Sequence, residues 1–388
     1  MKPKAKRMQD LKPQFFAALR EKISAMRARG VDVINLDVGS PDLPPAPHIV
    51  ETLVGAAHQN DTHGYQPHRG IDELRQAWAE YYQREHDVEL DPERQVLQVL
   101  GSKEGIFHLS TVLVDDGDVV LIPDPGYVTY THGALFAGGT PFYLPLSPEN
   151  GWLPDLDEIP EDILRQAKIL WLNYPNNPTA ATASTVFFEK VLSLARAYDL
   201  VVCHDAAYTR ITFDCYHAPS ILELPGAMDV AVEFNTLSKT YNMAGWRVGA
   251  AVGNAEVISA LYSLKTRVDS SHFLPVWRGA IAALTGDQDW VAQRNSIYQE
   301  RRDLLLSGIN RLGLQAHVPL ASFYLWARVP SGFTSMQFAG ELLDATGVSI
   351  TPGTVFGACG EGYVRITLCA AKARIEQALA RMERWRGV

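Results

Sequence analysis

The sequence predicts an α/β protein: a large domain with a mainly parallel sheet flanked by helices, and a smaller α+β domain. In the middle of the 388-residue chain, short apolar runs bounded by polar, Pro or Gly residues alternate with helical patterns. Such alternation is typical of parallel strands that helices cover on both faces. Towards the C-terminus the pattern changes to a long helix followed by isolated strands and turns.

The expected strands of the large sheet are short and rich in β-branched residues. They lie at Val96–Leu100, Val119–Ile122, Ile169–Leu172, Leu200–Cys203, Val230–Phe234 and Val248–Val252. Helices are expected from about Ile106 and over Val186–Ala197. Because ligands of such folds bind beyond the carboxyl ends of the strands, functional residues should follow these runs directly.

The last part of the chain is expected to form the smaller domain. Its expected elements are helices at Asp289–Leu312 and Ser335–Ala345, strands at Phe323–Arg328 and Tyr363–Thr367, a turn at Thr351–Gly357 and a final helix. We expect a large domain at residues 48–285 and a small domain built from residues 1–47 and 286–388.

Composition argues against several classes of protein. The net charge of −9 argues against nucleic-acid binding, which requires a basic surface. The four cysteines form no C-x-x-C pair and no zinc-spaced cluster with histidine, so a reducing compartment and no metal are expected. No signal peptide is visible, and no apolar run approaches the ~18 residues that span a bilayer. We expect a cytoplasmic protein without membrane or nucleic-acid partners.

The most specific motif is TLSKTYNMAGWRVG, from Thr236 to Gly249. Its Lys239 follows a strand, lies between hydroxyl residues and precedes Arg247. A lysine that forms a Schiff base must first lose its proton, and hydroxyls with an arginine suit a phosphate. A solvated lysine on a loop is the alternative for an isolated S-K-T, but the whole string favours a Schiff-base lysine beside a phosphate site.

Asp205, at the end of another strand, is a candidate partner for the nitrogen of a pyridinium ring. An unpaired Asp205 would be costly at the end of an apolar run, whereas a pyridinium nitrogen would pair with it. A ring kept protonated in this way is the better electron sink. Tyr208 could donate to the phenolic oxygen of that ring. The alternative for Asp205 taken alone is a helix N-cap.

Three other strand exits carry candidate ligand residues. Asn177 would offer its amide to the ring oxygen or a substrate carboxylate, or it belongs to a plain Asn-Pro turn. Tyr127 would lie over a ring, or it is an aromatic residue of the core. Backbone N–H groups at the helix start in Gly101–Gly105 suit a phosphate, although a Gly-rich turn alone is a weak signal.

A single charge lies inside the expected strand Tyr363–Thr367. A buried Arg365 requires an anionic partner. A substrate α-carboxylate bound by two hydrogen bonds would supply that partner. The alternative is an internal salt bridge.

Together these residues resemble the class I/II aminotransferases, which are pyridoxal phosphate (PLP) enzymes of fold type I. The resemblance runs from Asp37–Asp42 through Tyr65–Gly70 to Tyr363–Arg365, and Ser238–Gly249 is its most specific part. The chain looks most like the bacterial LL-diaminopimelate aminotransferase branch. The stretches that resemble that branch are Gly101–Gly105, Asp124–Tyr127, Glu149–Gly151, Asn173–Thr179, Cys203–Tyr208 and Ser238–Gly249.

The resemblance implies a role for each candidate residue. Lys239 would carry PLP and move the Cα proton, Asp205 would pair with the ring nitrogen, and the remaining ring contacts would come from Asn177, Tyr208 and Tyr127. The residues implied to hold the phosphate are Ser102, Lys103, Thr236, Ser238 and Arg247, with Tyr65 from the partner subunit of a homodimer. Arg365 and the Gly39 backbone would receive the substrate carboxylate.

The chain departs from the family pattern at a few positions. Ala180 stands where relatives usually have Gly, and Ala206 stands where many have Glu. Arg267 stands where the branch tends to have Asn, and His63–His68 around Tyr65 is altered. The last two differences lie near the expected side-chain pocket, where Arg267 is a candidate ligand for a second carboxylate.

The predicted function is a ping-pong aminotransferase that moves an amino group between an L-amino acid and a 2-keto acid, of the LL-diaminopimelate/glutamate type. A PLP-dependent lyase or decarboxylase on the same fold is the alternative, since a fold does not fix its reaction. Arg365 favours a reaction that retains the carboxylate. A PLP-binding regulator is disfavoured by the intact Lys239 and by the absence of room for a DNA-binding module.

Overall fold

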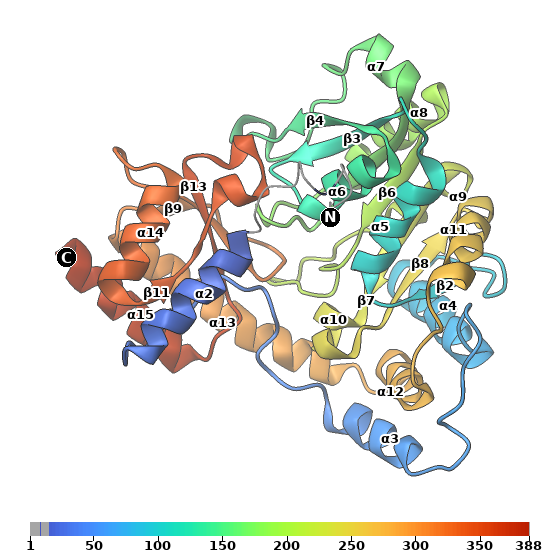
Figure 1. The fold of residues 1–388 in the computed structure, drawn as a ribbon, viewed down its shortest axis with the longest axis horizontal. Helices are drawn as coiled ribbons and strands as arrows, with labels where there is room; N and C mark the ends of the chain where they lie inside the picture. Colours follow the sequence, from blue (N-terminus) through green and yellow to red (C-terminus); the bar gives the residue numbers. More distant parts are fainter. Residues whose placement is uncertain (1–7, 9–14, 388) are drawn as a thin grey trace, which may run out of the picture.

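Seven strands form the central sheet of the computed structural model, which describes residue 8 and residues 15–387 (Figure 1). Their order is β2 (Val96–Val99), β8 (Gly249–Gly253), β7 (Ala231–Thr236), β6 (Val201–Asp205), β5 (Ala167–Leu172), β3 (Val119–Asp124) and β4 (Thr140–Pro145). Pairing is parallel from β7 to β4, whereas β8 is antiparallel to both of its neighbours. This confirms the prediction of a mainly parallel sheet.

Several strands extend further than their apolar runs predicted, and two of them end at an aspartate. Strand β3 continues to Asp124, which pairs with Pro145, and β6 continues to Asp205, which pairs with Phe234. Strand β4 was not predicted at all. It carries two prolines and lies at the edge of the sheet, where proline is tolerated and the burial pattern is weak.

The two faces of the sheet bury alternate residues of each strand. In β5, Ile169 and Trp171 pack beneath α5 (Ser102–Leu113), α6 (Val128–Ala137) and α11 (Ala255–Val268). Leu170 and Leu172 point to the other face and its helices, which are α3 (Pro47–Ala57), α4 (Asp72–His86), α8 (Thr185–Tyr198) and α12 (Leu274–Thr285). Because both faces are buried, the sequences of these strands are continuous apolar runs and do not alternate with polar residues. No helix in the described part of the chain is long and apolar enough to span a membrane.

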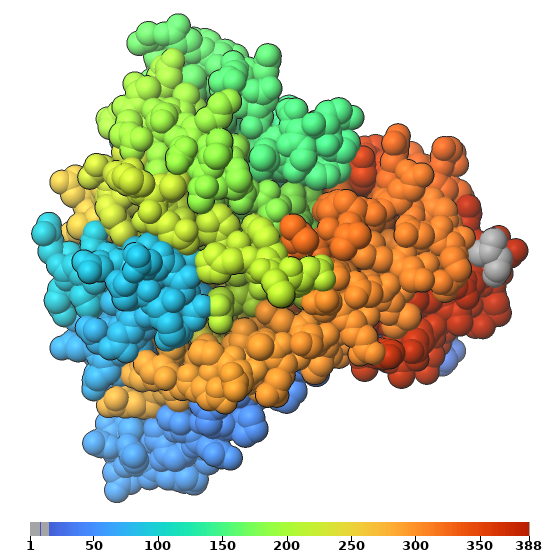
Figure 2. Space-filling model, turned by 180° about the vertical axis from the view of Figure 1, so that it is seen from behind, coloured from blue at the N-terminus to red at the C-terminus, as the bar shows by residue number. Residues whose placement is uncertain are grey.

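The smaller part is a four-stranded antiparallel sheet with helices. Its strand order is β12 (Thr351–Pro352), β13 (Tyr363–Thr367), β10 (Tyr324–Arg328) and β9 (Gln315–Ala316). Its helices are α2 (Phe15–Ala28), α13 (Asp289–Arg311), α14 (Ser335–Thr346) and α15 (Lys372–Arg386). Seen from behind, the orange residues of α13 run between the two parts of the molecule (Figure 2).

The N-terminal segment crosses to this smaller part. Strand β1 (Ile34–Asn35) pairs in parallel with β11 (Val348–Ser349). This pairing supports our proposal that residues 1–47 and 286–388 form one domain and residues 48–285 the other. Of the proposed small domain, residues 1–7, 9–14 and 388 lie outside the described part of the chain.

Candidate active site

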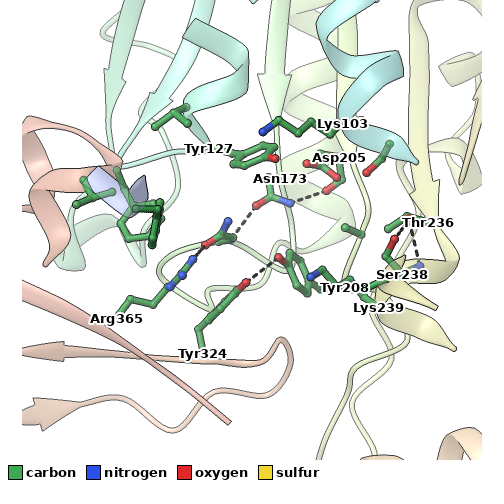
Figure 3. Close-up of a pocket in the computed structure, with 18 of the residues that line it drawn as sticks. Lys103, Tyr127, Asn173, Asp205, Tyr208, Thr236, Ser238, Lys239, Tyr324 and Arg365 are labelled. Carbon is green, nitrogen blue, oxygen red and sulfur yellow. Dashed lines mark hydrogen bonds between the residues drawn. The ribbon is translucent and has the colours of Figure 1, made fainter. Parts of the chain in front are cut away.

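A cavity of about 330 Å³ lies at the carboxyl ends of β5, β6 and β7, facing β10 and β13 (Figure 3). It brings together most of the residues predicted from the sequence. These are Ser102, Lys103, Tyr127, Asn177, Asp205, Tyr208, Thr236, Ser238, Lys239, Arg247 and Arg365. Gly39 lines an adjacent cavity instead, and Tyr65 is 92% exposed and lines neither cavity.

Lys239 occupies the short helix α10 (Leu237–Thr240), directly after β7. Thr236 caps this helix by accepting a hydrogen bond from the backbone N–H of Ser238. Burial, with the positive charges of Arg365 and Arg247, lowers the pKa of Lys239 to about 8. Nζ donates a hydrogen bond to the carbonyl oxygen of Gly39 at 2.5 Å. Near neutral pH this amine therefore loses its proton far more readily than an exposed lysine, as a nucleophile requires.

Asp205 has one carboxylate oxygen without a partner. Oδ2 accepts a hydrogen bond from the Tyr130 hydroxyl at 2.9 Å, whereas Oδ1 is buried and has no hydrogen-bond partner among the described residues. Burial raises the pKa of Asp205 to about 6. An unpartnered buried oxygen at a cavity wall fits a ring N–H donor. Tyr130 was missed from the sequence because a tyrosine in a helix reads as core.

The loop after β5 joins Asp205 to Arg365. Asn173 donates from Nδ2 to the backbone oxygen of Asp205 at 2.6 Å and accepts the backbone N–H of Asn177 at 2.7 Å. Asn177 Oδ1 then accepts a hydrogen bond from Arg365 Nη1 at 2.7 Å. The side-chain nitrogen Nδ2 of Asn177 takes no part in these bonds, so it is available to donate to a ligand. Asn173 was not predicted, because an Asn at a strand exit reads as a turn residue.

Tyr208 is paired with a second tyrosine. Its hydroxyl lies 3.0 Å from the hydroxyl of Tyr324, which comes from β10. A side chain at Gly39 would collide with Tyr324, since its Cβ would lie 1.9 Å from the hydroxyl oxygen. Glycine at this position is thus required for the close approach of the two segments. Tyr324 was missed because it lies in an apolar strand and gives no polar signal in the sequence.

The opposite end of the cavity fits an anionic group. Helix α5 begins there at Ser102, after Gly101, whose φ of 77° is in the left-handed region. A Cβ on Gly101 would lie 2.3 Å from Arg247 Nη2, so glycine also makes room for the guanidinium. Hydroxyls, helix N–H groups and a guanidinium in one place suit a phosphate.

Arg365 is buried and forms no direct ion pair among the described residues, although burial raises the pKa of the nearby Asp37 carboxyl and the charge of Arg365 opposes that rise. Its Nη2 donates to the backbone oxygen of Asp37 at 2.7 Å, and its guanidinium lies 4.2 Å from the ring centre of Tyr324 and 4.6 Å from that of Phe356. The ion pairs found among residues 8 and 15–387 do not include Arg365. An internal salt bridge is thus not the reason for this arginine, and an anion beside it would be favourable.

A second cavity of about 650 Å³ adjoins the first and shares Phe16, Lys103 and Arg365 with it. Helix α2 forms one wall, from which Arg20 and Arg27 reach the cavity. Arg267 instead lies in the last turn of α11, where it binds Ser263, and it lines neither cavity. The contribution of α2 was missed because its residues form an ordinary amphipathic helix pattern.

Comparison with known proteins adds evidence of descent to this geometry. The family model for aminotransferase class I and II matches residues 31–382. A protein of Moorella thermoacetica named LL-diaminopimelate aminotransferase is 50% identical over 380 residues, which cover 98% of this chain and 97% of that protein. A protein of the same name from Syntrophobacter fumaroxidans is 48% identical over 381 residues, covering 98% of each.

Solved structures agree in fold. Substrate-bound BacF from Bacillus subtilis superposes with a TM-score of 0.96 at 36% identity, over 100% of this chain and 98% of that one. A single mutant of aspartate aminotransferase from Thermus thermophilus gives a TM-score of 0.92 at 32% identity, over 99% and 100% of the two chains.

Proposed function

This chain belongs to the class I and II aminotransferases and is a PLP-dependent enzyme of fold type I, and from that premise we propose the role of each residue in its cavity. The observation that carries the proposal is the convergence of Lys239, Asp205 and Arg365 on one cavity. The three supply an amine of lowered pKa, an unpartnered buried carboxylate and a buried guanidinium that forms no direct ion pair among the described residues.

When bound, PLP supplies an electron sink for the charge that develops at the substrate Cα. Lys239 Nζ would hold the cofactor covalently, and as a free amine it would accept the Cα proton of the substrate. Burial lowers the pKa of this amine to about 8, which makes Nζ a better proton acceptor near neutral pH than an exposed lysine. Asp205 Oδ1, which is buried and has no partner among the described residues, would accept a hydrogen bond from the ring nitrogen and keep that nitrogen protonated.

The remaining contacts orient the cofactor. Asn177 Nδ2 and the Tyr208 hydroxyl hold the ring oxygen, and Tyr127 packs against the ring. The residues proposed to hold the phosphate are Ser102, Lys103, Thr236, Ser238 and Arg247. Tyr65 joins them from the partner subunit of a homodimer, a proposal supported by its 92% exposure in the single chain.

Arg365 receives the substrate α-carboxylate, with the Gly39 backbone beside it. The guanidinium already lies against Asn177, so it is fixed before a substrate arrives. A site that grips the carboxylate retains it, which favours amino transfer over decarboxylation.

For the substrate we propose LL-diaminopimelate as amino donor and 2-oxoglutarate as acceptor, with glutamate and the 2-keto acid of the donor as the products. Relatives named for this activity are 44–50% identical over nearly the whole chain. The second cavity, with Arg20, Arg27 and Lys103 on its wall, offers positive charge to a second carboxylate. A cytoplasmic location is part of the proposal, and cell fractionation would test it.

Steady-state assays with each candidate donor and 2-oxoglutarate test this function. We expect glutamate to form fastest with LL-diaminopimelate. Release of a keto acid and ammonia without any acceptor would instead identify the lyase alternative. A donor such as alanine that outpaced every dicarboxylate would refute the proposed substrate while leaving amino transfer intact.

A further inference from the structure

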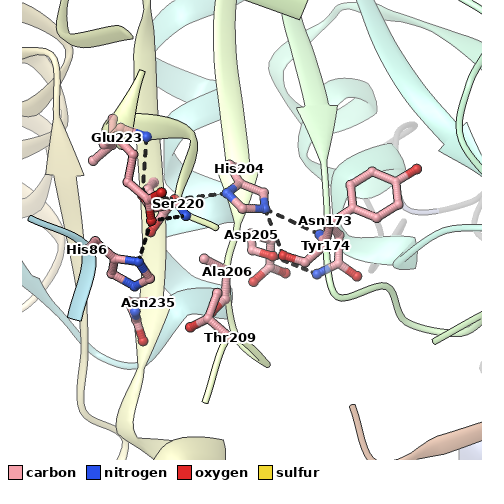
Figure 4. A network of polar contacts seen from close by, with 12 residues as sticks. His86, Asn173, Tyr174, His204, Asp205, Ala206, Thr209, Ser220, Glu223 and Asn235 are labelled. Carbon is pink, nitrogen blue, oxygen red and sulfur yellow. Dashed lines mark hydrogen bonds and ion pairs between the residues drawn. The ribbon is translucent and has the colours of Figure 1, made fainter. Parts of the chain in front are cut away.

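A fully buried pair of titratable residues lies beside the cavity, on the strands that lead to Asp205 and Lys239. His204 of β6 and Glu233 of β7 are direct register partners, and both side chains have 0% exposure. His204 Nδ1 lies 2.9 Å from Glu233 Oε2. Figure 4 shows His204 with its ring directed towards Asn173 and Tyr174 on one side. Neither residue lines the cavity, and the proposed mechanism uses neither.

Glu233 is held as a carboxylate by three donors. Besides His204, the Tyr82 hydroxyl donates to Oε1 at 2.7 Å and the Ser220 hydroxyl donates to Oε2 at 2.8 Å. Burial alone would raise the pKa of Glu233, but the hydrogen bond and positive charge of His204 hold it below its usual value. A buried carboxylate requires hydrogen-bond donors, and His204 is the titratable residue in direct contact with it.

The second ring nitrogen of His204 faces another acceptor. Nε2 lies 2.9 Å from the backbone oxygen of Tyr174, and the backbone N–H of Tyr174 donates a hydrogen bond to Nε2 at 3.3 Å. Nε2 therefore contacts the backbone of Tyr174, while Nδ1 contacts the carboxylate of Glu233. His204 therefore connects the buried carboxylate of Glu233 to the loop that follows β5.

That loop carries the asparagines of the cavity. Tyr174 is flanked by Asn173, which binds the backbone of both Asp205 and Asn177. Asn177 in turn binds Arg365. A fixed Tyr174 carbonyl therefore restrains the contacts at the end of the cavity where the substrate carboxylate is proposed to bind.

We propose that His204, held by Glu233, is a positioning residue for substrate and cofactor, because it fixes the loop that sets Asn177 against Arg365. The inference rests on the proposed function and adds to it two residues that lie outside the cavity. The competing explanation is a buried pair that only stabilises the pairing of β6 with β7. The two explanations predict different results when the pair is broken but the sheet stays folded. Only the positioning role predicts that the loop after β5 loses its fixed contacts with Arg365.

The test compares His204→Gln and Glu233→Gln with the wild-type holoenzyme. We expect KM for LL-diaminopimelate to rise about tenfold in both variants, as the loss of one charged hydrogen bond implies. The value of kcat should fall less than KM rises. The dissociation constant of PLP, measured on the cofactor-free proteins by equilibrium dialysis, should rise severalfold.

Tyr82→Phe is the matched control, because it removes one hydrogen bond to the same carboxylate without touching His204 or the loop. It should lower Tm and leave KM and the PLP dissociation constant unchanged. The inference is overturned if Tyr82→Phe raises KM as much as the Gln variants do, or if the folded Gln variants match the wild type. If His204→Gln does not fold, Glu233→Gln distinguishes between the two explanations, since it keeps the histidine and the side-chain volume.

A wild-type protein that transfers no amino group would refute the proposed function instead. The dissociation constants for PLP would still decide the role of His204 in that case. Equal constants in the wild type and both Gln variants would then overturn this inference.

Discussion

Arg365 and Asn177 form a direct hydrogen bond, 2.7 Å from Nη1 to Oδ1, that joins the two parts of the molecule across the cavity. Arg365 comes from β13 of the smaller part and Asn177 from the loop after β5 of the large sheet. The residue proposed to bind the substrate carboxylate is thereby tied to the residue proposed to bind the ring oxygen. A substrate carboxylate that binds Arg365 would therefore also affect the position of Asn177.

Replacement of this arginine tests the carboxylate site. Arg365→Lys keeps the charge but loses the planar pair of donors, so kcat/KM for every amino donor should fall about 10- to 100-fold. The loss should appear mainly in KM, measured by steady-state kinetics. Arg328→Lys is a control in the same sheet, outside the first cavity, and should change little. An unchanged KM in Arg365→Lys would show that the carboxylate binds elsewhere.

Asp205 should destabilise the cofactor-free protein while serving the reaction. Its folded-state pKa of about 6 lies above the ordinary value of 3.8, so the charged form is disfavoured in the folded state. The unfavourable contribution of Asp205 to the stability of the folded protein is therefore full above pH 6 and disappears as pH falls below 4. We expect cofactor-free Asp205→Asn to be more stable than wild type at pH 7.5, by up to about 3 kcal/mol, in urea denaturation.

The same substitution should weaken PLP binding and abolish most turnover, because Asn cannot keep the ring nitrogen protonated. At pH 4 the stabilities of the two proteins should converge. A wild type that is the more stable protein at pH 7.5 would contradict the raised pKa of Asp205.

Ala180 is a strained residue in the loop that carries Asn177. Its φ of 59° is in the left-handed region, which costs an alanine about 1–2 kcal/mol. Relief of this strain offsets the loss of one buried methyl group and the extra backbone freedom of glycine, so Ala180→Gly should stabilise the protein by up to about 0.7 kcal/mol.

Ala197→Gly offers the opposite control, because Ala197 lies exposed in α8 and should lose about 0.5–1 kcal/mol. Both values follow from urea denaturation of the cofactor-free proteins. Equal destabilisation by the two substitutions would show that the loop imposes no strain at Ala180.

The sequence predicted the parallel sheet and the residues at its strand exits because both follow from local patterns. Lys239, Asp205 and Asn177 each stand directly after an apolar run, and the topology of the sheet brings such positions together. Strand β4 could not be predicted in this way, because an edge strand with two prolines has no apolar run.

The residues missed at the site share one property, which is that their local surroundings are unremarkable. Tyr130 and Tyr324 look like core aromatics, and Phe16 belongs to an amphipathic helix. Only contacts distant in the chain, such as Tyr130 with Asp205, make them part of the site. The pair His204–Glu233 is of the same kind, since two buried strands carry it and the sequence around each is apolar.

Lys239 is the central residue of the proposed reaction, and a half-reaction tests its role. Wild type and Lys239→Ala would be loaded with PLP and mixed with LL-diaminopimelate without an acceptor, and the visible absorption of the cofactor would be followed. We predict that the wild-type band bleaches and returns on addition of 2-oxoglutarate, while Lys239→Ala keeps its fold and shows neither change. A wild type that does not respond to any amino acid, or a Lys239→Ala variant that responds as fast, would contradict the account.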